Sequence, residues 1–201
     1  LLQNAEDALG RRGDAGGRRS VTFTLSPGRL KLSHFGRLFD EADVRGVCGI
    51  AQSTKDQHSI GRFGIGFKSV YTFTDRPEIH SGDEDFAIEN YVQPTAAARL
   101  PREASETQIL LPLRPEDLSA GREIGIGMQN LGPGALLFLR HINEINWSIE
   151  GGASGAYFRS DPETLGPDVQ RNRVIGRETE KAEIDQSWLV FRREVLATTG
   201  E

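Results

Sequence analysis

The chain has 201 residues, with 24 Lys and Arg against 29 Asp and Glu, and a formal net charge of −5. This length suits one domain, or one domain with a fragment, and the mild acidity with mixed signs argues against broad electrostatic binding to nucleic acid. No run of about 18 apolar residues and no basic-then-apolar leader is present, which excludes a transmembrane helix and gives no sign of secretion. The single cysteine, Cys48, fits a reducing compartment, so we expect a cytoplasmic protein.

The chain opens with a predicted helix followed by a predicted hairpin. Apolar residues in 1–9 recur at i, i+3, i+4 and i+7, the spacing of one helix face, and Gly10 and Gly13 are expected to end it. Residues 20–26 and 29–34 each alternate apolar and polar side chains about a Pro-Gly pair, which predicts two antiparallel strands joined by a tight turn.

A second helix is predicted over 40–52. Asp40 is its expected N-cap and Asp43 lies at the N3 position, the arrangement of a capping box. The segment 61–73 then begins as a glycine loop and is expected to become helical near Gly66.

The sequence from residue 78 onward predicts strands, then an interrupted helix, then further strands. The strands are expected at 78–81, 85–92 and 107–114, with a flexible connection before the last of them, and 115–140 has a helical pattern interrupted by Gly-Pro-Gly. Apolar runs further on predict strands near 145–149, 155–159 and 187–195. This order predicts an α+β fold, a two-layer sandwich with a mixed, mostly antiparallel sheet and helices on one face. We divide it into a core, 1–114, and a helical and β extension, 115–201, of the same or an adjoining domain.

The glycine loop is the most informative segment of the chain. Gly61, Gly64 and Gly66 have G-x-x-G-x-G spacing, which matches neither the dinucleotide fingerprint nor the Walker loop. Glycines still let the backbone approach a ligand, and a helix that starts there offers free N–H groups to phosphates, with Lys68 adding a positive charge. The alternative is a glycine-rich turn that packs tightly under a sheet.

A polar residue on the first helix gives the loop a possible partner. The side-chain oxygen of Asn4 is a hard ligand that suits Mg²⁺, which binds few protein oxygens and several phosphate oxygens. Taken alone, an Asn on an amphipathic helix is ordinarily a surface residue. Together the two features predict a Mg²⁺-phosphate site.

Three separated motifs, in this order, resemble the GHKL superfamily of ATPases, which have the Bergerat fold. They read LLQNAEDA (1–8), CGIAQSTK (48–55) and IGRFGIGFKSVY (60–71), followed by TDRPEIHSG (74–82). The superfamily holds gyrase-type topoisomerases, heat-shock chaperones of the ninety-kilodalton class, histidine kinases and mismatch-repair ATPases, and the resemblance is closest to its chaperone-like, sacsin-type branch. The motifs cover a little over half of the chain.

The resemblance implies ATP and Mg²⁺ as cofactors and assigns roles by position. Asn4 matches the Mg²⁺ ligand, Asp7 the acid one turn later, and Gly36 the glycine of the second box. Ser53, Thr54 and Lys55 fall where the mobile lid begins, and Thr107 matches the threonine that helps hold adenine. The phosphate-binding hinge and helix start correspond to Gly61, Phe63, Gly64, Ile65, Gly66 and Phe67.

Two positions depart from the superfamily pattern. His34 stands where an Asp normally binds the adenine amino group, and a neutral imidazole accepts that amine in one tautomer alone. The general base of active members is a Glu four residues before the Asn, a position immediately before Leu1, so no catalytic residue is identified.

The resemblance therefore predicts a Mg-ATP-binding, chaperone-like module that acts as a nucleotide-driven conformational switch, with ATPase activity in a longer protein. Its expected partners are ATP or ADP, other domains of that protein, and a second copy bound through regions outside this chain. The first alternative is a non-hydrolysing scaffold or protein-interaction domain with the same fold, which His34 favours. The second is an unrelated α+β domain whose glycines serve packing.

Overall fold

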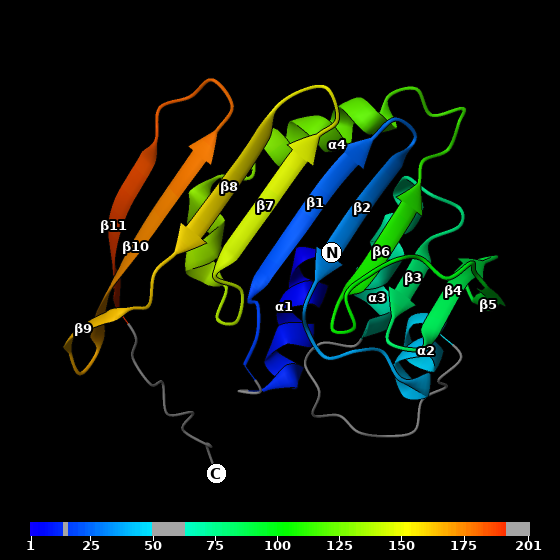
Figure 1. Ribbon diagram of the computed structural model, residues 1–201, viewed down its shortest axis with the longest axis horizontal. Coiled ribbons are helices and arrows are strands. Elements are labelled where there is room, and N and C mark those ends of the chain that lie inside the picture. The colour runs from blue at the N-terminus through cyan, green and yellow to red at the C-terminus, as the bar shows by residue number, and fades with distance from the viewer. Residues whose placement is uncertain (14–15, 50–62, 192–201) are drawn as a thin grey trace, which may run out of the picture.

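The protein is described by a computed structural model that covers residues 1–13, 16–49 and 63–191. Its main feature is one eleven-stranded sheet (Figure 1). The strands are β1 (Ser20–Ser26), β2 (Arg29–His34), β3 (Glu78–Ser81), β4 (Glu84–Glu89), β5 (Gln93–Ala96), β6 (Thr107–Pro112), β7 (Glu144–Ile149), β8 (Ser154–Arg159), β9 (Glu163–Gly166), β10 (Val169–Glu178) and β11 (Ile184–Phe191). The helices are α1 (Leu2–Arg12), α2 (Glu41–Val47), α3 (Phe63–Lys68) and α4 (Ala120–Gln129), with 3₁₀ turns η1 (Ser69–Thr72) and η2 (Pro133–Phe138).

Ten of the strands follow the order β11-β10-β8-β7-β1-β2-β6-β3-β4-β5, and β9 pairs with β10. The pair β1–β7 is parallel and the other strand pairs are antiparallel. The helices lie behind the sheet in Figure 1. The predicted α+β class, with a mixed and mostly antiparallel sheet, is confirmed.

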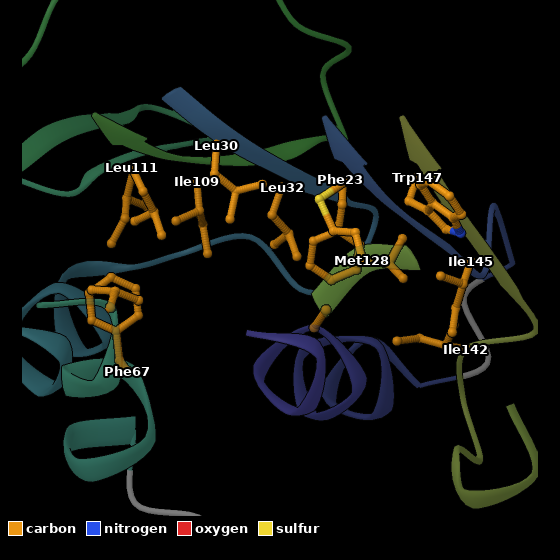
Figure 2. Close-up of a cluster of buried hydrophobic side chains, with 14 of the residues drawn as sticks. Phe23, Leu30, Leu32, Phe67, Ile109, Leu111, Met128, Ile142, Ile145 and Trp147 are labelled. Carbon is orange, nitrogen blue, oxygen red and sulfur yellow. The ribbon is translucent and has the colours of Figure 1, made fainter. Parts of the chain in front are cut away.

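The hydrophobic core lies between the sheet and the helices. Val21, Phe23 and Leu25 alternate with half-buried polar residues along β1, so one face of the strand is apolar. In register beside them on β7 stand Ile145 and Trp147, and the apolar face continues across the sheet. Figure 2 shows Phe23 and Ile145 on the side of the sheet that faces α1 and Met128. Burial of this apolar area is the main stabilising term for the layered arrangement.

Two locally determined predictions are confirmed in detail. The strands β1 and β2 form the expected hairpin, and Gly28 in its turn has φ of 72°, a backbone conformation that glycine adopts without strain. Helix α2 begins after Asp40, whose side chain accepts a hydrogen bond from the Asp43 backbone, while the Asp43 side chain accepts one from the Asp40 backbone.

Other boundaries differ from the prediction. Helix α3 begins at Phe63, three residues before the expected start near Gly66. A short strand, β5, stands at 93–96 where the segment from 94 was expected to be a flexible connection, and its Pro94 is tolerated because β5 is at the edge of the sheet. The ten-residue β10 was not predicted.

The strands after residue 115 continue the sheet formed by the first part of the chain. Strand β7 pairs along its whole length with β1, from Ser20↔Glu144 to Leu25↔Ile149. The first and second parts of the chain therefore share one sheet. Within the described residues, no helix is long and apolar enough to cross a membrane.

Candidate functional site

The side chain of Asn4 on α1 lies against the backbone of Gly66 on α3. A Cβ placed on Gly66 would stand 3.6 Å from Asn4 Oδ1, the one contact within 4 Å found for it among the described residues. Asn4 Nδ2 is buried and has no hydrogen-bond partner among the described residues. A buried NH₂ group without an acceptor is uncommon in native proteins, where water, an anion or an oxygen of a ligand ordinarily satisfies it.

The folded chain thus brings the first motif, which contains Asn4, next to the third motif, which contains Gly66, as expected. Asn4 projects from α1, whose buried residues Ala5, Ala8 and Leu9 fix the rotation of the helix against the core. An amide oxygen beside a glycine backbone is a suitable ligand for Mg²⁺, because the missing side chain leaves room for phosphate oxygens on the metal.

Helix α3 uses its residues differently from the prediction. Because it begins at Phe63, the amides of Phe63, Gly64 and Ile65 belong to its first turn, whereas Phe67 N–H lies in the helix and faces the Phe63 carbonyl. The Phe67 side chain is buried and rises toward Leu111 and Ile109 of the sheet (Figure 2), so it is a core residue. Phe67 thus does not supply a free helix-start donor.

Lys68 points toward the end of α2. Its Nζ would lie 3.5 Å from a Cβ on Gly49, which follows the C-cap residue Cys48 of α2. A cation near a helix C-terminus interacts favourably with the helix dipole. The structure therefore gives Lys68 a neighbour other than Asn4.

The adenine-binding candidates of the sheet lie in one row across three strands. His34 on β2 pairs with Thr107 on β6, and Thr107 pairs with Ser81 on β3. All three alternate in phase with core residues of their strands, and all three are at most 2% exposed. They therefore form a buried polar row on the helix side of the sheet.

His34 is a neutral imidazole whose acceptor nitrogen is already used. Burial lowers its pKa to about 4, while the carboxylate of Glu106 opposes the shift. The Gly36 backbone amide donates to Nδ1 at 3.1 Å, so the neutral ring carries its proton on Nε2. The remaining ring nitrogen is a donor, and it does not fit the amino group of adenine, which requires an acceptor.

The Thr107 hydroxyl is paired inside the protein. It lies 2.5 Å from Ser81 Oγ, and Ser81 Oγ accepts the backbone N–H of Phe39 at 3.0 Å. Ser81 was not predicted as part of the row, because a lone Ser at a strand end carries no signal until the register of β3 and β6 is known. This network holds the 35–39 loop onto the sheet.

Gly36 is required by helix packing. A Cβ at this position would stand 2.6 Å from the backbone carbon of Ala8 and 2.8 Å from Leu9 N, distances that real side chains do not reach. The neighbouring Arg37 N–H donates to Ala8 C=O at 2.8 Å. Gly36 therefore contacts α1 directly, and this contact accounts for the glycine without a ligand.

The two acids of α1 have separate positions. Glu6 is buried and its carboxylate accepts three backbone N–H bonds, at 2.6, 2.9 and 2.9 Å, from Arg140, His141 and Ile142. Asp7 accepts Gln3 Nε2 at 2.9 Å and lines a cavity with His141. Glu6 is thus a structural anchor that the sequence did not reveal, since its partners are more than 130 residues away.

Another buried charged group lies on the opposite face of the sheet. His80 Nδ1 is 2.7 Å from Asp85 Oδ1, and Arg102 Nη1 donates to the same oxygen at 2.7 Å. Arg102 also donates to the carbonyl of Gly82 at 2.7 Å. These contacts fasten the loop before β6 to the β3–β4 hairpin. In the described part of the chain, no group of three or more His, Cys, Asp or Glu has an arrangement suited to a metal ion.

Several predicted site residues have no described surroundings. Ser53, Thr54, Lys55 and Gly61 lie outside the described residues, and only the backbone is described at Phe63, Gly64 and Ile65. Of the predicted set, the structure places Asn4 beside Gly66, and His34 beside Thr107 in a separate row.

Comparison with known proteins shows what the middle part of the chain is similar to. Residues 32–110 match the sequence model of the Sacsin domain. That stretch is sacsin-like. It contains His34, Gly36, Gly66 and Thr107, whereas Asn4 lies before it.

Two curated proteins are similar to the chain. Protein NO VEIN from Arabidopsis thaliana is 33% identical over 103 residues, which cover 47% of this chain and 4% of that protein. Sacsin from Homo sapiens is 38% identical over 95 residues, which cover 42% of this chain and 2% of that protein. The chain thus corresponds to a small fraction of the length of each relative. The predicted sacsin-type resemblance is confirmed at the level of this domain.

Proposed function

We propose that the chain is a Mg-ATP-binding module of the GHKL type, with a Bergerat sandwich as its fold, which acts as a nucleotide-driven switch in a larger, chaperone-like protein. The observation that carries this proposal is the side chain of Asn4, whose buried Nδ2 has no hydrogen-bond partner among the described residues, beside the bare backbone of Gly66. The likeness of residues 32–110 to the Sacsin domain supports it. Both relatives are far longer than this chain, which supports the part of the proposal that makes it a module of a larger protein.

Asn4 and Gly66 fit the metal and phosphate end of such a nucleotide. Asn4 Oδ1 would bind Mg²⁺, and the ion would neutralise the charge of the phosphate oxygens that share it. Gly66 would admit those oxygens because it has no side chain. A bound nucleotide that contacts both α1 and α3 would favour one arrangement of the two helices, and this differential affinity is what makes a switch.

The residues expected to bind the adenine base of such a nucleotide fit it less well. His34 has a donor to offer, so it would bind an acceptor of the base, such as a ring nitrogen, in place of the amine. This observation favours a second candidate function, a GHKL-like scaffold that binds other proteins and has little selectivity for adenine.

Thermal unfolding with and without Mg-ATP separates the two functions. A ligand at a hundredfold excess over its Kd raises the free energy of unfolding by about 2.7 kcal/mol, so the melting temperature should rise with Mg-ATP and less with ATP and EDTA. An unchanged melting temperature at millimolar Mg-ATP, in a protein with a cooperative transition, would support the scaffold and contradict nucleotide binding.

A further inference from the structure

A polar cavity of about 270 Å³ lies between η2 and the strands β8 and β10, away from Asn4 and Gly66. Three arginines line it: Arg19, Arg140 and Arg159. Its volume lies just below the range of ligand pockets, roughly 300–1,000 Å³, and suits a small ligand.

Two of these arginines are held in place by backbone carbonyls. Arg19 donates through Nε to His141 C=O at 2.6 Å and through Nη2 to Arg140 C=O at 2.7 Å. Arg159 donates to carbonyls of the same turn, those of Leu136, Leu139 and Ile142. Carbonyl groups are dipoles without net charge, so these bonds fix the guanidinium groups and leave their positive charge.

Among the described residues, carboxylates do little to cancel the charge of Arg19 and Arg140. Neither Arg19 nor Arg140 has an ion-pair partner among the described residues. Asp161 is the one acidic group among the described lining residues, and it is exposed. The cavity therefore has a net positive lining.

Two amide side chains of β10 complete the lining without partners of their own. Gln170 Oε1 is buried and has no hydrogen-bond partner in the described structure. Asn172 is 5% exposed, and no hydrogen bond of its side chain is found among the described residues. An amide can present either its oxygen or its NH₂ group to the same point, so each can donate to an anion.

We propose that this cavity binds a small anion that carries a carboxylate or phosphate group. Arg19 would supply fixed positive charge, the exposed Arg140 a second guanidinium, and Gln170 an N–H donor once its amide group is turned about its terminal bond. Planar guanidinium groups recognise both kinds of oxyanion through paired hydrogen bonds. Because two of the arginines are already immobilised, binding would order few side chains.

The test uses inorganic phosphate and citrate as probes, at constant ionic strength set with sodium chloride, with melting temperature and isothermal titration calorimetry as readouts. We expect saturable binding of at least one probe, weakened fivefold or more by Arg140→Ala and by Gln170→Leu. Arg122→Ala, which removes an exposed arginine on α4, is the matched control and should bind as the parent does. Saturation by phosphate alone, or by citrate alone, identifies which oxyanion the cavity takes.

Asn4→Ala separates this cavity from the proposed nucleotide site, and it should leave the binding of the probe unchanged. The proposal is overturned if neither probe binds more tightly than chloride. It is equally overturned if Arg140→Ala and Gln170→Leu, both folded by circular dichroism, bind with the parent affinity.

Discussion

Asn4 Oδ1 lies 3.6 Å from the point where a Cβ of Gly66 would stand, which places the first helix of the chain directly against the glycine segment. One side of this contact is an amide whose buried Nδ2 has no partner in the part of the chain that the structure describes, and the other is a backbone without a side chain. A substitution at either residue therefore changes the site more than it changes the core.

Asn4→Ala is expected to remove the Mg²⁺ dependence of ATP binding, because the side-chain oxygen is the proposed metal ligand. The free energy of unfolding should change by less than about 1 kcal/mol, since the Nδ2 group has no hydrogen bond to lose. Gln3→Ala, an exposed amide on the same helix, is the control. Titrations with ATP, with and without Mg²⁺, measure the effect, and an undiminished response to Mg²⁺ in the variant would remove Asn4 from the site.

Gly36→Ala is expected to destabilise the fold by about 3 kcal/mol. Its Cβ would meet the α1 backbone at 2.6 Å, and neither element has room to move without disturbing the core. Gly46→Ala is the matched control, because a Cβ at that helical position meets nothing within 4 Å and should stabilise by up to about 1 kcal/mol. Urea unfolding compares the two, and equal stabilities would show that the 35–37 segment is not packed on α1.

Glu6→Gln is expected to lower the free energy of unfolding by about 2 kcal/mol. A carboxylate accepts the three N–H bonds from residues 140–142, whereas an amide turns an NH₂ group toward some of these donors. Asp7→Asn, one residue along the same helix, should cost less than about 0.5 kcal/mol, because its bond to Gln3 is exposed. If the two substitutions have the same effect in chemical denaturation, Glu6 does not anchor this loop.

His34 is expected to make the fold less stable in mild acid. Its pKa lies near 4 in the folded chain and near 6.5 in the unfolded chain, so between these values the unfolded state binds a proton that the folded state does not. The stability it contributes is complete above pH 6.5 and falls by about 3 kcal/mol as the pH drops to 4.

The variant His34→Asn isolates this effect, because an amide oxygen still accepts the Gly36 N–H and does not titrate. The free energy of unfolding of the parent minus that of the variant should therefore fall by about 3 kcal/mol between pH 7.5 and pH 4. Parallel curves would mean that His34 takes up its proton in the folded state as readily as in the unfolded state, so that burial does not lower its pKa.

Features set by near neighbours in the chain were predictable from the sequence. The capping box of Asp40 and Asp43 and the turn at Gly28 depend on residues within three positions of each other, and both are found as predicted. The pairing of Asn4 with Gly66 was predictable for a different reason, since it followed from the resemblance and not from any local pattern.

Features set by distant parts of the chain were not predictable. Strand β10 buries Asn172, Val174 and Gly176 and exposes Ile175 on its outer face, so it lacks the alternation of apolar and polar residues typical of a strand. The role of Glu6 depends on backbone groups far along the chain, and the tautomer of His34 depends on the fold of the loop after β2. The start of α3 was misplaced because glycines give a weak helix signal even where the surrounding structure holds them in a helix.

The most direct test of the proposed function is calorimetric titration of Mg-ATP into the parent chain and into Gly66→Ala. The added methyl group makes only ordinary contact with Asn4, so the variant should fold with at least the parent stability. We predict that the parent binds Mg-ATP and that the variant binds it at least tenfold more weakly, while Gly46→Ala binds as the parent does. Equal affinity in the parent and in Gly66→Ala, or no heat of binding in either, would contradict a nucleotide site between Asn4 and Gly66.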